Sequence, residues 1–331
     1  PEFVHTWGAK SYHSQVNLNR LSNRESLAMV TNLLGTEEID RDLEELILEK
    51  TEGIPFFIEE FIKSLKDLKI IETKDNKYYL AKDIQEVPLP STIQDVIMAR
   101  VDSLPEGAKE LLQTGSVIER EFSHELIKRV TSLAHGAWLS QLSVLKDSEL
   151  IYERGIYPES TYIFRHALTR QVVYDSILTK RKIKLHGEIG NAIEELYKDH
   201  IGEHCEVLTG HYIKSEDYEK GAEFSKLAAN KARMGASFND AIAYAEKRAA
   251  CLEKLPRTEN VEKQLIDARV NLGLYYNQVF NHVGAKEAVE PIIELALKRD
   301  YKKRISHIYT IMGTHSFMVE GDYSNAFQYL E

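Results

Sequence analysis

The feature that most limits the fold of this chain is a short helical pattern that recurs in its C-terminal half. The segments are DYEKGA at residues 217–222, FNDAIAY at 238–244 and GDYSNA at 321–326, and Gly273 and Gly313 stand 40 positions apart. Small residues at fixed helical positions let two helices approach closely. A period near 40 therefore predicts tetratricopeptide-like helix pairs, with irregular spacing because the standard repeat is about 34 residues.

Length and charge limit the protein class. At 331 residues the chain is long enough for two or three cores, and 43% hydrophobic residues indicate a folded protein. A net charge of −10 argues against general binding to DNA, RNA or anionic membranes. Cys205 and Cys251 show no CxxC spacing, which favours a reducing cytoplasmic compartment. No apolar run reaches the roughly 18 residues of a membrane span, and no signal peptide opens the chain.

Changes in pattern along the chain predict a mainly α fold, a helical lid plus a winged helix followed by a tetratricopeptide-like α-solenoid. The first expected domains are a residual strand of a nucleotide-binding domain at residues 1–21 and a helical lid with a small hairpin at 22–103. A winged helix at 104–178, a helical domain with the first repeat-like pairs at 179–255 and truncated repeats at 256–331 are expected to follow. The strand is expected at residues 14–18, where polar and apolar residues alternate.

Local signals place the helices of the lid. Ser22 and Glu25 have the spacing of a capping box, and a second helix is expected over residues 40–50. Pro55 suits the first turn of a third helix, because its missing N–H would be unpaired there anyway. A hairpin is expected over residues 70–80. Ser91 is then expected to cap a helix whose inward side chains are Ile93, Val96, Ile97 and Val101.

The next segment has the order of a winged helix. Helices are expected at residues 106–118, 123–132 and 136–149, followed by two strands at 151–153 and 161–164. A further helix is expected from His166 to Leu178.

Four segments together resemble AAA-like signal-transduction ATPases with numerous domains. The similar relatives are bacterial proteins in which this ATPase and a tetratricopeptide array are fused to a class III nucleotide cyclase. The motifs run in order over about residues 1–255, and they are PEF at 1–3 with Trp7 and LNRL at 18–21, GIPFFIEE at 53–60, VP at 87–88 with IQDVI at 93–97 and RVDSL at 100–104, and FRHAL at 164–168 followed by Tyr174 and His186.

The resemblance implies roles for three residues in the intact parent protein, which would hold ATP or ADP. In the family, the proline of a Gly-x-Pro motif packs against the adenine, and Gly53 and Pro55 match that motif. A winged-helix histidine of related switches reaches the phosphates of bound ADP and stabilises a closed state, and His166 is the matching position. The alternatives are helix initiation for Pro55, and for His166 a partly buried histidine that caps nearby backbone.

The chain also departs from the family. It has no Gly-x-x-x-x-Gly-Lys-[Ser/Thr] loop and no apolar strand ending in paired acids, so we expect no catalysis and no bound cofactor for this chain alone. Because the first residue is Pro1 rather than Met, we expect a fragment without the phosphate-binding part, although vector residues are an alternative. Glu119 stands where relatives carry glycine, which puts a tight turn there in doubt.

Two further patterns suggest sites that we do not expect. His200, His204 and His211 recur at offsets that would share one helical face, a pattern seen in zinc sites, but Gly202 and Gly210 weaken a continuous helix, so we predict no metal. The basic run at residues 180–184 and the winged helix suggest DNA binding. The expected recognition helix carries only one basic residue, Lys146, which disfavours DNA binding.

The favoured function is a regulatory and signal-relay module of a nucleotide-dependent switch. Its partners would be a protein or peptide on the repeats and an effector domain in cis, with no membrane and no nucleic acid. A stand-alone interaction scaffold is the alternative, and a winged-helix DNA-binding regulator is the third reading.

Overall fold

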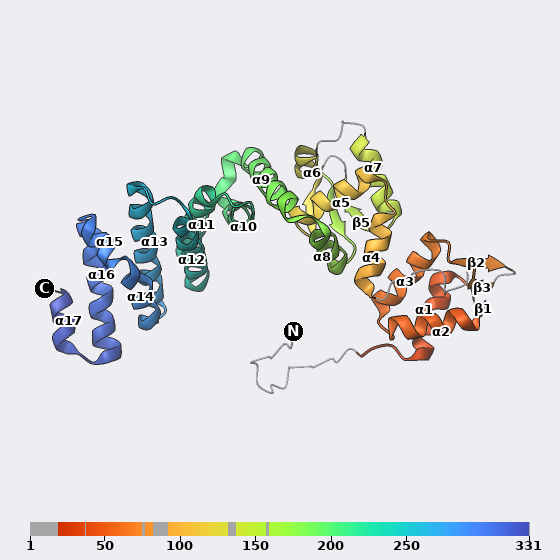
Figure 1. Ribbon diagram of the computed structural model, residues 1–331, viewed down its shortest axis with the longest axis horizontal. Helices are drawn as coiled ribbons and strands as arrows, with labels where there is room; N and C mark the ends of the chain where they lie inside the picture. Colours follow the sequence, from red (N-terminus) through yellow and green to blue (C-terminus); the bar gives the residue numbers. More distant parts are fainter. Residues whose placement is uncertain are drawn as a thin grey trace. The chain divides into compact units, whose positions relative to one another are not determined.

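The computed structural model shows a mainly α-helical protein, as predicted (Figure 1). The chain divides into two compact units, Pro1–Lys109 and Glu110–Glu331. The strand expected at residues 14–18 lies outside the described residues, which are 19–36, 38–74, 77–81, 92–131, 137–156 and 159–330.

The first unit consists of helices around one small sheet. Its helices are α1 (Asn23–Leu34), α2 (Arg41–Thr51), α3 (Pro55–Asp67) and α4 (Ile93–Asp102). Its strands are β1 (Glu38–Ile39), β2 (Ile71–Lys74) and β3 (Lys77–Leu80), in the order β1-β3-β2.

Capping residues fix where two of these helices begin. The predicted capping box of α1 is present, with the Ser22 N–H donating to Glu25 at 2.8 Å and the Glu25 N–H donating to the Ser22 hydroxyl at 3.4 Å. The prediction that Ser91 caps α4 is wrong. Thr92 is the cap, because its hydroxyl accepts from the Asp95 N–H while the Asp95 carboxylate accepts from the Thr92 N–H at 3.1 Å.

The predicted hairpin is also present, with Ile71 opposite Leu80 and Lys74 opposite Lys77. The sequence did not predict β1, whose two residues pair in parallel with β3 through Glu38–Lys77 and Ile39–Tyr78. Apolar faces of the helices pack under this sheet. The core side chains that are almost fully buried include Val30, Leu43, Ile47, Ile58, Phe61, Ile62, Leu65 and Val96.

The second unit starts with three helices and a sheet of three strands. These are α5 (Glu106–Ile118), β4 (Glu121–Ser123), α6 (His124–Val130), α7 (Ala137–Asp147), β5 (Ile151–Arg154) and β6 (Thr161–Phe164), and the strand order is β4-β6-β5. The helices and the β5–β6 hairpin confirm the predicted order. The sequence missed β4, which pairs antiparallel with β6.

Near the end of α5 a glycine is required at position 115, and none is required at position 119, where Glu119 stands. A Cβ on Gly115 would lie 2.7 Å from the Phe122 ring, which packs against this face of the helix. Glu119 is not among the residues with positive φ, so its backbone needs no glycine. The doubt about Glu119 is thereby resolved.

A succession of helices forms the rest of the unit. Consecutive helices pack on one another from α9 onward. They are α8 (Ala167–Ser176), α9 (Thr179–Leu196), η2 (Lys198–Glu203), α10 (Cys205–Lys214), α11 (Tyr218–Met234), α12 (Phe238–Lys254), α13 (Glu259–Gln278), α14 (His282–Val289), η3 (Glu290–Ile292), α15 (Ile293–Lys298), α16 (Lys302–His315), η4 (Ser316–Glu320) and α17 (Tyr323–Leu330).

Glycines in these helices allow the close contacts that the repeat pattern predicts. A Cβ on Gly273 of α13 would lie 2.9 Å from Ile311 of α16 and 3.0 Å from Val289 of α14. A Cβ on Gly221 of α11 would lie 3.2 Å from the sulfur of Cys251 on α12. Within the described residues, no helix combines the length and apolarity that crossing a bilayer requires.

Candidate functional site

The turn between α2 and α3 is built around Gly53. Glu52 and Gly53 both have positive φ, 49° and 71°, so the chain reverses abruptly after α2. A side chain on Gly53 would overlap the carbonyl oxygen of Leu21. The Leu21 N–H donates to the Gly53 carbonyl at 2.8 Å, which ties the segment before α1 to this turn. Glycine is therefore required at position 53 for both its φ and its contact.

Pro55 occupies the first position of α3, as predicted, and its side chain is exposed. Ile54 precedes it as the N-cap residue and is also exposed, at 37%. No side chain caps the helix there. The turn thus exposes two consecutive apolar residues, Ile54 and Pro55, at the N-terminus of α3.

A buried ion pair holds α3 against α4, and its α3 partner lies five residues after Pro55. Glu60 on α3 and Arg100 on α4 are 1% and 5% exposed, and the Arg100 guanidinium donates to the Glu60 carboxylate. Arg100 also lies 3.6 Å from Asp67. Lys63 lies 2.8 Å from Glu59 and 3.9 Å from Glu60.

The sequence contains a pattern that predicts this pair. Glu60 follows Phe57 by three residues, and Arg100 follows Val96 by four, so each lies on the apolar face of its helix. Two opposite charges on two buried helix faces predict a pair, because an isolated buried charge is very costly.

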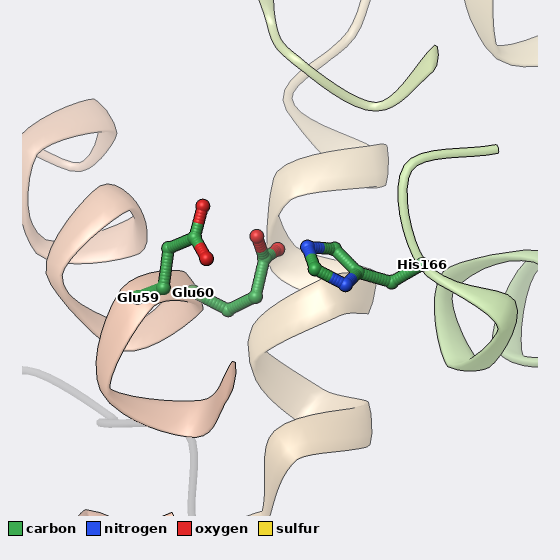
Figure 2. Close-up of side chains that lie close together, drawn as sticks. All are labelled: Glu59, Glu60 and His166. Atoms are coloured by element: carbon green, nitrogen blue, oxygen red, sulfur yellow. The ribbon is translucent and has the colours of Figure 1, made fainter. Parts of the chain in front are cut away.

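His166 is the N-cap residue of α8 and is half-buried. Its side chain does not cap the helix, so the alternative in which the imidazole caps nearby backbone lacks support at α8. Figure 2 shows the carboxylates of Glu59 and Glu60, which extend from α3, and the ring of His166, the residue immediately before α8. Gly53 and Pro55 share one turn of the first unit, whereas His166 belongs to the second.

A groove of about 300 Å³ lies on the helical array, lined by α12, α13 and α14. Three glutamates line it, Glu246, Glu253 and Glu287. The Tyr276 hydroxyl donates to Glu246 at 2.6 Å, and this bond, followed by burial, raises the pKa of Tyr276 to about 12. Arg269 pairs with Glu253. The groove is therefore acidic with one aromatic wall.

The histidines with zinc-like spacing do not share a helix. The helix η2 ends at Glu203 and α10 begins at Cys205, so no single helix runs from His200 to His211. His204 stacks on Tyr197 with ring centroids 3.9 Å apart, while His211 contacts His186 on α9. The offsets in the sequence therefore do not correspond to one helical face.

The expected recognition helix, α7, has no fully exposed basic side chain in its described part. Trp138, Leu142 and Leu145 are buried. The exposed side chains of its described part are Leu139, Ser140, Ser143 and Asp147, and Lys146 pairs with Glu153 at 2.7 Å. A helix that reads bases needs Arg, Lys, Asn or Gln on that face, so this surface does not favour DNA binding.

Comparison with known proteins gives two similarities. Residues 22–78 match the model of a family described as a domain of unknown function (DUF8739). A crystal structure of a signal transduction ATPase with numerous domains that has a tetratricopeptide repeat sensor, from Pyrococcus horikoshii, matches with 13% identity and a TM-score of 0.35. That match covers 95% of this chain and 47% of the archaeal chain, so this chain spans about half of that protein's length. No curated protein matches.

Proposed function

We propose that this chain is the regulatory and signal-relay part of a nucleotide-dependent switch ATPase. It would couple bound ATP or ADP to an effector domain in cis and to a protein-interaction array, without catalysis of its own. The observation that carries the proposal is the α2–α3 turn, in which Gly53 is fixed against Leu21 and Pro55 is exposed at the start of α3.

The residues of the turn fit the group that the proposal requires. An exposed proline ring flanked by Ile54 offers an apolar surface for an adenine. The imidazole of His166 would donate to a phosphate oxygen of ADP, and a donor at that position responds to the charge of the nucleotide. Nucleotide would shift the switch only through a difference in affinity for its two states.

The test is nucleotide binding by the full-length protein with Pro55→Ala. Alanine is tolerated at the first position of a helix, so α3 should remain folded. We expect ADP to dissociate faster from the variant, by about tenfold, because one apolar face of the adenine contact is lost.

The matched control is Pro105→Ala, since Pro105 is also exposed and also stands at the start of a helix, α5. The control should release ADP at the rate of the unaltered protein. Equal ADP release from both variants and from the unaltered protein would remove the role assigned to Pro55.

A second function, that of an interaction scaffold, is favoured by the acidic groove on α12–α14. Its three glutamates suit a partner segment that carries lysine or arginine. If the scaffold function is the whole function, partner binding will be the same with ATP, with ADP and without nucleotide.

A further inference from the structure

A separate pocket of about 240 Å³ lies within the second unit, where α8, α9 and α10 meet the end of α5. Arg170 from α8, His186 from α9, and His211 and Lys214 from α10 line it. It contains none of the residues assigned above to nucleotide. Its polar lining is rich in nitrogen donors, which is unusual for a protein with a net charge of −10.

Three cations surround one aromatic ring beside this pocket. The Lys182, Arg170 and Lys214 charges lie 4.6, 5.6 and 5.9 Å from the centre of the Tyr174 ring. In the described part of the chain, none of the three forms an ion pair. The Arg170 Nε atom donates to the Ser116 carbonyl at 2.8 Å, which fixes the guanidinium at the pocket while its Nη atoms make no hydrogen bond to the described residues.

The two carboxylates that line the pocket, Glu119 and Glu206, neutralise only part of this positive charge. Glu206 lies 2.9 Å from Lys231 on α11, and so its charge is matched there. Glu119, exposed at the end of α5, forms no ion pair with the described residues, and its single charge offsets only one of the three cations. The pocket therefore has a surplus of positive charge.

Two buried histidines extend from the pocket into the core. His186 Nδ1 lies 2.9 Å from His211 Nδ1, and the Tyr174 hydroxyl lies 3.0 Å from His186 Nε2. One proton must lie between the two Nδ1 atoms. If His186 supplies it, Tyr174 donates to His186 and His211 carries its remaining proton on Nε2 as a donor. This tautomer gives a lining residue of the pocket a free N–H.

Burial, reinforced by the neighbouring cations, keeps both rings neutral at pH 7. Burial and then the charge of His211, Lys214, Arg170 and Lys182 lower the pKa of His186 to about 3. Burial and then Lys214 and Arg170 lower the pKa of His211 to about 4. A neutral imidazole that lines the same pocket as the Arg170 and Lys214 cations suits an anion with several acceptor oxygens.

We propose that this pocket binds a phosphate group, as inorganic phosphate or as a small phosphate monoester. Arg170 and Lys214 supply the charge, and His211 supplies an N–H donor when His186 holds the proton shared between the two Nδ1 atoms. A volume of about 240 Å³ accommodates a phosphate with a small substituent. Because α8 to α10 lie in the sequence between the β4–β6–β5 sheet and the helices α11 to α17, a bound phosphate would stiffen that connection.

The test is binding of inorganic phosphate and of phenyl phosphate to the 331-residue chain by calorimetry at constant ionic strength. Tighter binding of phenyl phosphate indicates a monoester, and tighter binding of inorganic phosphate indicates the free ion. Proton NMR of the His211 ring provides an independent readout, because an anion beside the ring favours its protonated form and should raise its pKa.

Lys214→Gln should weaken phosphate binding about tenfold, since one charge-assisted hydrogen bond is lost. Lys214 is exposed, and its replacement leaves the core intact. Lys226→Gln is the matched control, an exposed lysine on α11 away from the pocket lining, and should bind as the unaltered chain does. Glu119→Gln should tighten binding by removing a competing carboxylate. Absent binding of both phosphates, or equal weakening by Lys214→Gln and Lys226→Gln, would overturn the proposal.

Discussion

At the scale of single residues, the backbone at Gly53 determines how the α2–α3 turn is formed. Its positive φ and its contact with the Leu21 carbonyl both exclude a side chain, and these two reasons are separable. Gly35, at the end of α1, has nearly the same φ of 70° but nothing within 4 Å of where a Cβ would lie. The pair therefore distinguishes backbone strain from overlap.

Gly53→Ala should destabilise the chain more than Gly35→Ala does. Positive φ costs alanine about 1 kcal/mol at either position. At position 53 the overlap with Leu21 adds a displacement of the segment before α1, for a total of about 2–4 kcal/mol. Urea unfolding of the two variants measures the difference. Equal losses would mean that the Leu21 contact is not formed in solution.

The buried histidine pair predicts a loss of stability in mild acid. In the folded chain the pKa of His186 is about 3 and that of His211 is about 4, so both rings stay neutral in mild acid. In the unfolded chain each histidine is protonated near its ordinary pKa of 6.5. The unfolded state then binds more protons, so stability is complete above pH 6.5 and declines as the pH falls. We expect a loss on the order of 2–4 kcal/mol between pH 7 and pH 5.

Unfolding at the two pH values tests this expectation. His211→Gln should make the loss smaller, because one of the two titrating groups is removed. His200→Gln, at an exposed histidine, should leave the pH dependence unchanged. A chain equally stable at pH 5 and pH 7 would contradict the buried, neutral pair.

At the scale of secondary-structure elements, the Glu60–Arg100 pair fixes α4 to α3 and so supports the turn that carries Pro55. Both charges are nearly inaccessible to water, and each is compensated chiefly by the other. Removing one partner leaves an uncompensated buried charge, whereas replacing both with apolar side chains avoids that cost.

Arg100→Met should therefore destabilise α3 and α4 by about 3–5 kcal/mol, and the double variant Glu60→Leu, Arg100→Met should recover most of that loss. Hydrogen exchange of the α3 and α4 amides measures the effect locally. Arg41→Met breaks an exposed pair with Glu45 and should cost less than about 1 kcal/mol. Similar losses from Arg100→Met and Arg41→Met would contradict the burial of the pair.

The helices were predictable because their signals are local. Ser22 and Glu25 stand three residues apart, Pro55 follows a glycine, and apolar residues recur with the helical period. The strands β1 and β4 were not predictable in this way. They have two and three residues and exist only through pairing with β3 and β6, which are distant in sequence.

In the candidate site, too, the features set by local sequence were predictable and those set by packing between distant residues were not. The resemblance and the Gly-x-Pro pattern placed Gly53 and Pro55 on a turn, and the structure places both there. The Glu60–Arg100 pair and the His186–His211 contact join residues 40 and 25 positions apart, and both depend on packing between helices. The cap of α4 was misplaced by one residue because Ser91 and Thr92 are both good caps, and only the spacing to Asp95 decides between them.

At the scale of the whole molecule, the proposed nucleotide-contacting residues are divided between the two units, with Gly53 and Pro55 in the first and His166 in the second. Such a chain transmits a signal only if nucleotide binds its states with different affinity. His166→Leu in the full-length protein should therefore lower ADP retention and raise basal output together. His282→Leu, a half-buried histidine at the start of α14, is the matched control and should change neither.

The most direct measurement is the nucleotide content of the full-length protein, purified without added nucleotide, denatured, and analysed by chromatography. The proposal predicts close to one ADP or ATP per chain, and markedly less in the His166→Leu variant than in the His282→Leu control. A protein that carries no nucleotide, and takes up none when ATP or ADP is supplied, would contradict the nucleotide switch and leave the interaction scaffold as the function of the chain.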